Sequence, residues 1–193
     1  MKTIAFPGVD IPDIPRAVAL GIFDGVHIGH RAVITRAGGV EATVSAVFTF
    51  EQPPWALPKD AAWELISPDA KNRVLESLGV EELFRADFAA IRHLSPREFV
   101  RDVLRGTLHA RVVSCGFNYH FGKDGAGNAD MLRTLCEEYD IQLRLVEPVQ
   151  VDGLPVSASR IRRFIEQGEV QQAARMLGRP FTIDFPVVGG QKL

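Results

Sequence analysis

The sequence predicts an α/β fold with a doubly wound, mostly parallel, Rossmann-like sheet. Short apolar runs recur along the chain with helix-like runs between them, and this alternation is typical of parallel βαβ units with right-handed crossovers. The 193 residues, 46% hydrophobic and 24% charged, suit one domain with a sizeable core. A glycine-rich turn after the first of these runs is the kind of βα junction at which parallel sheets bind ligands.

Five strands and four helices are expected in the first 146 residues. Ser67-Pro68 combines an N-cap with proline at the first helical position, and Ser95-Pro96-Arg97-Glu98 has the capping-box pattern. Strands are expected at residues 18–21, 43–50, 83–86, 112–115 and 142–146. Helices are expected at residues 31–37, 67–79, 95–104 and 130–139.

The character of the chain changes after Pro148. Residues 149–156 look like a short extended stretch around an Asp152-Gly153 turn, and two helices follow at residues 159–167 and 170–177. Residues 181–193 form an extended, glycine-containing tail.

Residues 21–30, Gly-Ile-Phe-Asp-Gly-Val-His-Ile-Gly-His, predict a phosphate site. Glycines let backbone N–H groups approach an anion closely, and a helix N-terminus adds favourable dipole charge. His27 and His30, three residues apart, can face the same phosphate. Two alternatives are a pair of ordinary histidines and a zinc pair, although zinc needs further ligands and usually i, i+4 spacing.

A second candidate site lies where hydroxyl residues lead into an arginine-rich helix. Ser159 is expected to cap this helix, with Ser157 just before it, and Arg160 and Arg162 follow in its first turns. Free N–H groups and guanidinium groups bind phosphate oxygens well. The alternative is a capped surface helix with solvated basic side chains.

Two loops after predicted strands carry aromatic residues. Phe117, Asn118 and Phe121 follow the fourth strand, and Phe50 ends the second. The carboxyl ends of strands in open α/β sheets bind ligands, so these loops could line a pocket for a planar ring. The alternative is an ordinary loop over a small hydrophobic cluster.

Composition excludes several classes of protein. A net charge of −2 and a pI near 6.2 lack the basic footprint of a nucleic-acid binder. Cys115 and Cys136 form neither a disulfide framework nor a Cys-rich zinc site. The sequence shows no signal peptide, membrane span, P-loop, dinucleotide fingerprint or nucleophile elbow. We expect a cytoplasmic protein.

Taken together and in this order, these segments resemble the adenylyltransferase module of the bacterial bifunctional riboflavin kinase/FMN adenylyltransferase family, also called FAD synthetase. The resemblance covers about residues 15–188. It is carried by residues 21–30, 49–51, 116–122, 151–157 and 173–180. Ile22, Pro53 and Ala158 depart from the family pattern, in which Asn, His and Ser are usual.

The resemblance implies a Rossmann-like nucleotidyltransferase fold and the reaction ATP + FMN → FAD + pyrophosphate, with Mg²⁺ as cofactor. It implies a domain over residues 1–180 and a tail, 181–193, at the start of a riboflavin kinase module that this sequence lacks; such a module, in the same or another chain, is an expected partner. Asp24 is a candidate partner of the metal ion or a turn cap. The expected catalytic residues are His27, His30 and Arg162. The expected ATP-binding residues are Phe23, Asp24, Gly25, Gly29, Ser157, Ser159 and Arg160. The expected flavin-binding residues are Phe50, Phe117, Asn118 and Phe121.

Three other readings stay open at this point. One is a related nucleotidyltransferase with another acceptor, such as nicotinamide mononucleotide or phosphopantetheine. The second is a non-catalytic module that binds flavin or nucleotide, and the third is a structural domain paired with a kinase module.

Overall fold

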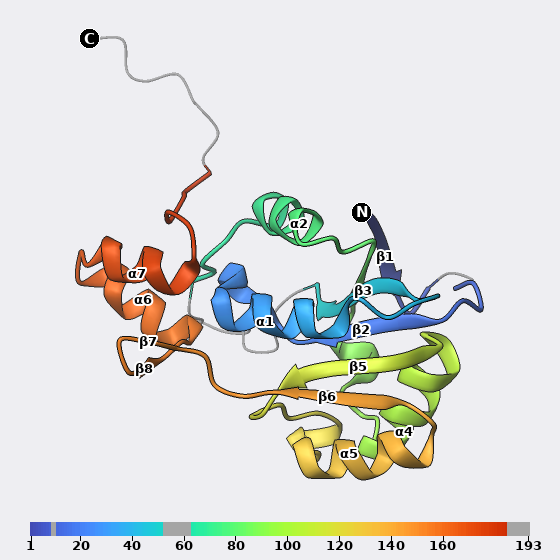
Figure 1. Ribbon diagram of the computed structural model, residues 1–193. Coiled ribbons are helices and arrows are strands. Elements are labelled where there is room, and N and C mark those ends of the chain that lie inside the picture. Colours follow the sequence, from blue (N-terminus) through green and yellow to red (C-terminus); the bar gives the residue numbers. More distant parts are fainter. Residues whose placement is uncertain (9–10, 52–62, 185–193) are drawn as a thin grey trace.

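A six-stranded parallel sheet forms the centre of the molecule (Figure 1). The computed structural model describes residues 1–8, 11–51 and 63–184. In spatial order the strands are β1 (Lys2–Phe6), β4 (Glu82–Ala86), β3 (Val44–Phe50), β2 (Arg16–Leu20), β5 (Ala110–Gly116) and β6 (Gln142–Val146). The chain runs outward from β2 through β3 to β4 and then crosses to β5 on the other side of β2. Such a reversal leaves a crevice at the carboxyl ends of the two strands, where ligands bind in this class of fold.

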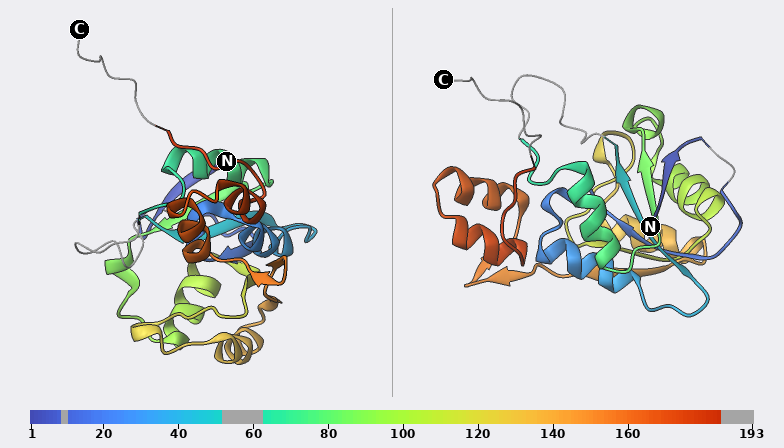
Figure 2. Two further views of the ribbon diagram at one scale, coloured as in Figure 1. Left: turned by 90° about the vertical axis from the view of Figure 1, so that its left-hand side faces the viewer. Right: turned by 90° about the horizontal axis from the view of Figure 1, so that it is seen from above.

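Helices cover both faces of the sheet, which confirms the doubly wound α/β prediction (Figures 1 and 2). One face carries α1 (Ile28–Ala37) and α2 (Pro68–Ser77), and the other carries the π-helix η2 (Phe99–Thr107) and α5 (Ala129–Glu138). Shorter helices lie in the connections. They are η1 (Asp24–Val26), α3 (Phe88–Ile91), α4 (Pro96–Glu98) and η3 (Lys123–Gly125).

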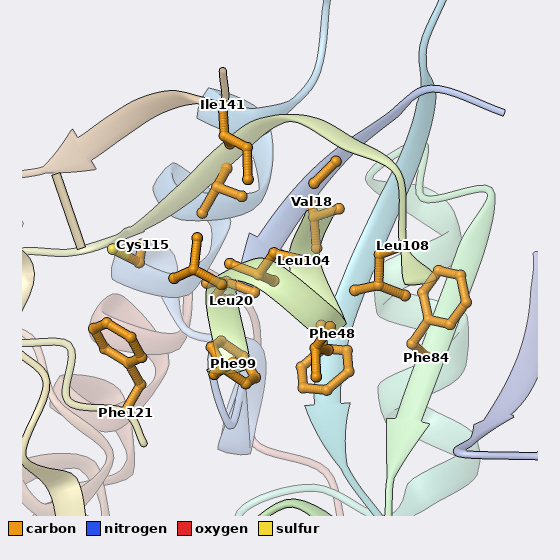
Figure 3. Packing of buried hydrophobic residues seen from close by; sticks show 14 of the residues in the cluster. Val18, Leu20, Phe48, Phe84, Phe99, Leu104, Leu108, Cys115, Phe121 and Ile141 are labelled. Atoms are coloured by element: carbon orange, nitrogen blue, oxygen red, sulfur yellow. The ribbon is translucent and has the colours of Figure 1, made fainter. Parts of the chain in front are cut away.

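The sheet buries apolar side chains on each face because successive residues of a strand point to opposite sides. On β2, Val18 and Leu20 join the cluster beneath η2 and α5, whereas Ala19 joins the cluster beneath α1 and α2. Figure 3 shows the first cluster, in which Val18, Leu20 and Phe48 pack with Phe99 and Leu104. This packing fixes the level at which β2 ends and the following loop begins.

The five predicted strands are confirmed, with ends that differ by at most two residues. The prediction missed β1, which pairs with β4 at the edge of the sheet. Only Ile4 and Phe6 of this strand are buried, so its alternating pattern is too short to stand out in the sequence.

The helix expected at residues 95–104 begins as predicted but ends later. Ser95 and Glu98 form the capping box at the start of α4. The chain then continues as η2 to Thr107, and the Leu108 N–H donates to the Val103 carbonyl at 2.8 Å. The predicted end at Leu104 is wrong because this wider turn keeps both Leu104 and Leu108 buried in the core.

A small helical unit follows β6 and lies beyond the carboxyl ends of the strands (Figure 2). The strands β7 (Gln150–Val151) and β8 (Leu154–Pro155) pair around Asp152 and Gly153, which both have positive φ. This confirms the turn that the sequence predicts there. Helices α6 (Ala158–Glu166) and α7 (Val170–Leu177) then pack on Leu65 through Ile161 and Leu177. Across the described ranges, no helix combines the length and the apolar character needed to span a bilayer.

The expected N-cap of α6 is wrong by two residues. The Ser157 hydroxyl accepts the hydrogen bond from the Arg160 N–H, and the helix begins at Ala158. Ser157 has extended backbone angles, as an N-cap requires, and Ser159 therefore lies within the first turn.

Candidate active site

The loop from β2 to α1 has an unusual backbone conformation. Phe23 and Val26 have φ angles of 54° and 38°, and Gly25 has a φ of 74°. Positive φ is costly for a β-branched residue such as Val26, and strain of this kind is found preferentially at functional sites. A β-carbon on Gly25 would lie 3.0 Å from Leu65 Cδ1, so this position also needs glycine for space.

Side chains from three distant segments hold this loop in place. Lys71 Nζ in α2 donates to the Ile22 carbonyl at 2.7 Å, and Thr49 Oγ1 at the end of β3 donates to the same oxygen at 2.9 Å. Arg179, after α7, donates to the Gly25 carbonyl at 2.7 Å. The sequence prediction missed these three anchors, because a single Lys, Thr or Arg has no local pattern that reveals a long-range contact.

Asp24 is the fourth anchor of the loop. Its carboxylate accepts from the Leu65 N–H at 2.8 Å and from the Arg162 guanidinium, which also donates Nε–H to the Trp63 carbonyl at 2.7 Å. Asp24 and Arg162 are 6% and 9% exposed, so the ion pair is buried. Burial raises the pKa of Asp24, while the Leu65 N–H and then the Arg162 charge oppose this shift.

His27 and His30 lie together at the start of α1. Their rings are stacked, with centroids 3.5 Å apart and an angle of 16° between the planes, and Phe23 packs edge-on against His30. His27 is the N-cap of α1, and its Nδ1 accepts from the His30 N–H at 3.2 Å. A β-carbon on Gly29 would lie 3.2 Å from the His27 ring, so glycine at this position leaves room for the stack.

Burial disfavours the protonated form of both imidazoles. Burial lowers the pKa of His27 to about 4, and burial together with the charges of His27 and Lys71 lowers the pKa of His30 well below its ordinary value. His30 Nδ1 is buried, and no described residue forms a hydrogen bond with it. An unpaired buried ring nitrogen is costly and is typical of a site that functions with a bound group. Burial also lowers the pKa of Lys71, to about 8.

The free energy of unfolding is expected to depend on pH because His27 is buried. Between about pH 6.5 and pH 4 the unfolded chain binds a proton at His27 that the folded chain does not bind, so the free energy of unfolding is expected to fall as the pH drops, by up to about 3 kcal/mol. His27→Asn keeps an N-cap acceptor but removes the titrating group. Urea denaturation at intervals from pH 7 to pH 4 should show a shallower fall for this variant. Parallel curves for the two proteins would contradict a buried, neutral His27.

The structure places the other predicted phosphate-site residues around α6. Arg162 points into the buried pair with Asp24, and its predicted contact with the triphosphate stays a prediction. The Arg160 guanidinium donates to the Pro155 carbonyl, and Ser157 is occupied as the N-cap. Ser159 is exposed in the first turn. The Asp24–Arg162 contact brings the start of this helix to the β2–α1 loop.

The predicted flavin residues separate into two groups. Phe50 is half-buried at the end of β3, against Phe88, and Phe117 and Asn118 are exposed just after β5, with Phe117 49% exposed. These three positions lie at the carboxyl edge of the sheet. Phe121 is different, because its pairing with Gly127 turns the ring into the core, where it is 5% exposed and packs against Phe99 (Figure 3). A stacking role for Phe121 is therefore not supported.

Residues 52–55 of the loop that follows Phe50 lie outside the described residues.

The described residues do not form a protein cage for a metal ion. They contain no group of three or more His, Cys, Asp or Glu side chains placed to bind one. Asp24, a candidate for a metal contact or a turn cap, already uses its carboxylate for Leu65 and Arg162. Cys115 and Cys136 are free and buried.

Comparisons with known proteins agree with the geometry. Residues 12–160 match the FAD synthetase family. The chain is 32% identical over 180 residues to a FAD synthetase of Listeria monocytogenes, covering 90% of this chain and 73% of that protein. It is 33% identical over 187 residues to a bifunctional riboflavin kinase/FMN adenylyltransferase of the same species, covering 93% of this chain and 59% of that protein. A crystal structure described as a macrolide-efflux protein from Streptococcus pneumoniae has a TM-score of 0.80 and 30% identity, over 93% of this chain and 60% of that one.

The family match extends from before β2 into the first turn of α6. It therefore includes the strained β2–α1 loop with Asp24 and both histidines, and it ends at Arg160. The resemblance predicted from the motifs is thus confirmed: this chain belongs to the FAD synthetase family.

Proposed function

We propose that this chain makes FAD by transferring AMP from ATP to FMN at the β2–α1 junction, with release of pyrophosphate. The stacked pair of His27 and His30 at the start of α1 is the observation that carries the proposal. The pair lies where the strand order reverses, which is where nucleotides bind in open α/β sheets. Membership of the FAD synthetase family supports the choice of ATP and FMN as substrates.

In the proposed reaction a phosphate oxygen of FMN attacks the α-phosphorus of ATP. The new oxygen–phosphorus bond forms as the bond from the α-phosphorus to the bridging oxygen breaks, and that electron pair leaves with pyrophosphate. No nucleophile from the protein is needed. Catalysis then consists of positioning the two phosphates in line and stabilising the charge that develops on them.

The two histidines supply hydrogen bonds and charge at this point. Because His27 Nδ1 accepts from the His30 N–H, the neutral His27 ring carries its proton on Nε2 and donates from there. Phosphate oxygens beside the rings favour the protonated form and raise the pKa of both imidazoles. The strained loop and the dipole of α1 add a fixed positive potential to the same place.

The flavin would lie along the carboxyl ends of β3 and β5. Phe50, Phe88 and Phe117 offer aromatic surface for the ring there, and Asn118 offers an amide. Mg²⁺ would enter with the phosphates of ATP, since magnesium is commonly held by substrate phosphates and few carboxylates. A riboflavin kinase, which produces FMN, is the partner activity, and the name of the bifunctional relative pairs the two.

A direct test mixes the protein with Mg-ATP and FMN. Flavin fluorescence is expected to fall as adenine stacks on the ring of the new FAD, and pyrophosphate is expected to appear in equal amount. Reactions without FMN and without protein serve as controls. Unchanged fluorescence and no pyrophosphate would contradict the proposal.

The same assay separates the alternatives. Pyrophosphate released with nicotinamide mononucleotide or phosphopantetheine, but not with FMN, would indicate a nucleotidyltransferase with another acceptor. Binding of ATP and FMN without release of pyrophosphate would indicate a non-catalytic module.

A further inference from the structure

Two arginines lie side by side next to the first turn of α1. Arg31 follows His30 directly, and Arg179 reaches the same place from the end of α7. Gly178 allows this approach, because it has a φ of 69° and an added β-carbon would lie 2.7 Å from Ile28 Cγ2 and 3.7 Å from Arg31 Nη1. Burial and then the nearby charge of Arg31 lower the pKa of Arg179.

Neither arginine has a charged partner in the part of the chain that the structure describes. Within residues 1–8, 11–51 and 63–184, Arg179 donates to three backbone carbonyls, those of Gly25, Val26 and Leu177. Within the same ranges, the buried Nε of Arg31 has no hydrogen-bond partner. The first turn of α1 contains no acidic residue either. Two other buried arginines do have a carboxylate partner, since Arg16 pairs with Glu82 and Arg162 pairs with Asp24.

This uncompensated charge lies at the nucleotide end of the molecule. The charge of Arg179 is close enough to His27 to lower the pKa of that ring. Arg162, by contrast, already donates to Asp24 and to the Trp63 carbonyl. Among the described residues, Arg31 and Arg179 thus offer guanidinium groups beside the histidines that no carboxylate neutralises.

We propose that Arg31 and Arg179 form a clamp for the β- and γ-phosphates of ATP and for the pyrophosphate that leaves. This inference rests on the proposed function, because it assigns the part of the substrate that lies next to the histidine pair. A diphosphate group carries several negative charges, and the planar guanidinium matches its oxygens with two parallel hydrogen bonds. The clamp would hold the leaving group while His27 and His30 act on the α-phosphate.

Inorganic pyrophosphate is the probe for this clamp, with binding to the full chain followed by calorimetry in the absence of FMN. Arg31→Gln and Arg179→Gln are each expected to weaken pyrophosphate binding about tenfold or more, because each removes charged hydrogen bonds. The KM for ATP should rise by a similar factor, whereas binding of FMN and of AMP stays within about twofold. Arg36→Gln, an exposed arginine on the last turn of the same helix, is the matched control and should bind pyrophosphate normally.

The two variants keep the test decisive. The Arg31 side chain makes no hydrogen bond among the described residues, so its replacement is expected to leave the fold intact even if Arg179→Gln disturbs the Gly25 loop. If the wild-type protein forms FAD but Arg31→Gln binds pyrophosphate with unchanged affinity, the clamp is wrong and the proposed reaction stands. If both arginines are needed for pyrophosphate binding but the wild-type protein forms no FAD, the proposed reaction is wrong and the clamp stands.

Discussion

Replacement of His30 by alanine is expected to lower the turnover number for FAD formation by roughly 10²-fold or more, the usual cost of losing one donor to a transition state. The ring lies on His27 with a buried and unpaired Nδ1, and nothing else in the described loop replaces it. Its removal should leave the protein folded, because the α1 cap is made by the backbone N–H of residue 30 and not by its ring. Steady-state kinetics and a thermal melt measure the two effects separately.

His109→Asn provides the control for this experiment. His109 lies just before β5, at the amino ends of the strands, whereas His30 follows their carboxyl ends. Its φ of 49° is one that asparagine tolerates. This variant should keep its turnover number within about twofold. Near-normal kinetics in His30→Ala would remove the histidine from the mechanism.

Replacement of Asp24 by asparagine is expected to destabilise the fold by about 3–5 kcal/mol, because it leaves the buried Arg162 without its counter-charge. The double variant Asp24→Asn with Arg162→Met should recover part of this loss, since no buried charge then remains unpaired. Urea denaturation of the three proteins gives the free energies.

The Asp152–Arg175 pair offers a matched control. It is also an aspartate–arginine contact, at 2.6 Å, but both side chains are about half exposed. Asp152→Asn should therefore cost less than about 1 kcal/mol. If Asp24→Asn cost no more than Asp152→Asn, the buried pair would not be a significant support of the site.

The sequence predicts the local part of this molecule well. Strand runs, the Ser95 capping box, the Asp152-Gly153 turn and the glycine-rich junction each depend on neighbouring residues, and all are present in the structure. The spacing of His27 and His30 predicts that the two rings lie on one side of the helix start, and in the structure they stack. What local patterns cannot reveal is the set of long-range contacts, such as Lys71 to Ile22 and Arg179 to Gly25.

Two differences between expectation and structure share a physical cause. The sequence predicts a flavin contact for Phe121 because it follows a strand with other aromatic residues; this contact stays a prediction, and the pairing with Gly127 turns the ring inward. Ser159 was chosen as a cap because it precedes the arginines, but the extended backbone begins at Ser157. In each case the backbone orientation within a few residues decides where the side chain points, and the composition of the segment does not predict that orientation.

The Asp24–Arg162 contact joins residues 138 positions apart. On a ribosome that adds about 5–20 residues per second, the loop of Asp24 would emerge on the order of ten seconds before the arginine that secures it. A nascent chain that has completed the sheet would therefore still lack this support for the β2–α1 loop. The loop thus gains its aspartate–arginine anchor only after α6 has been synthesised.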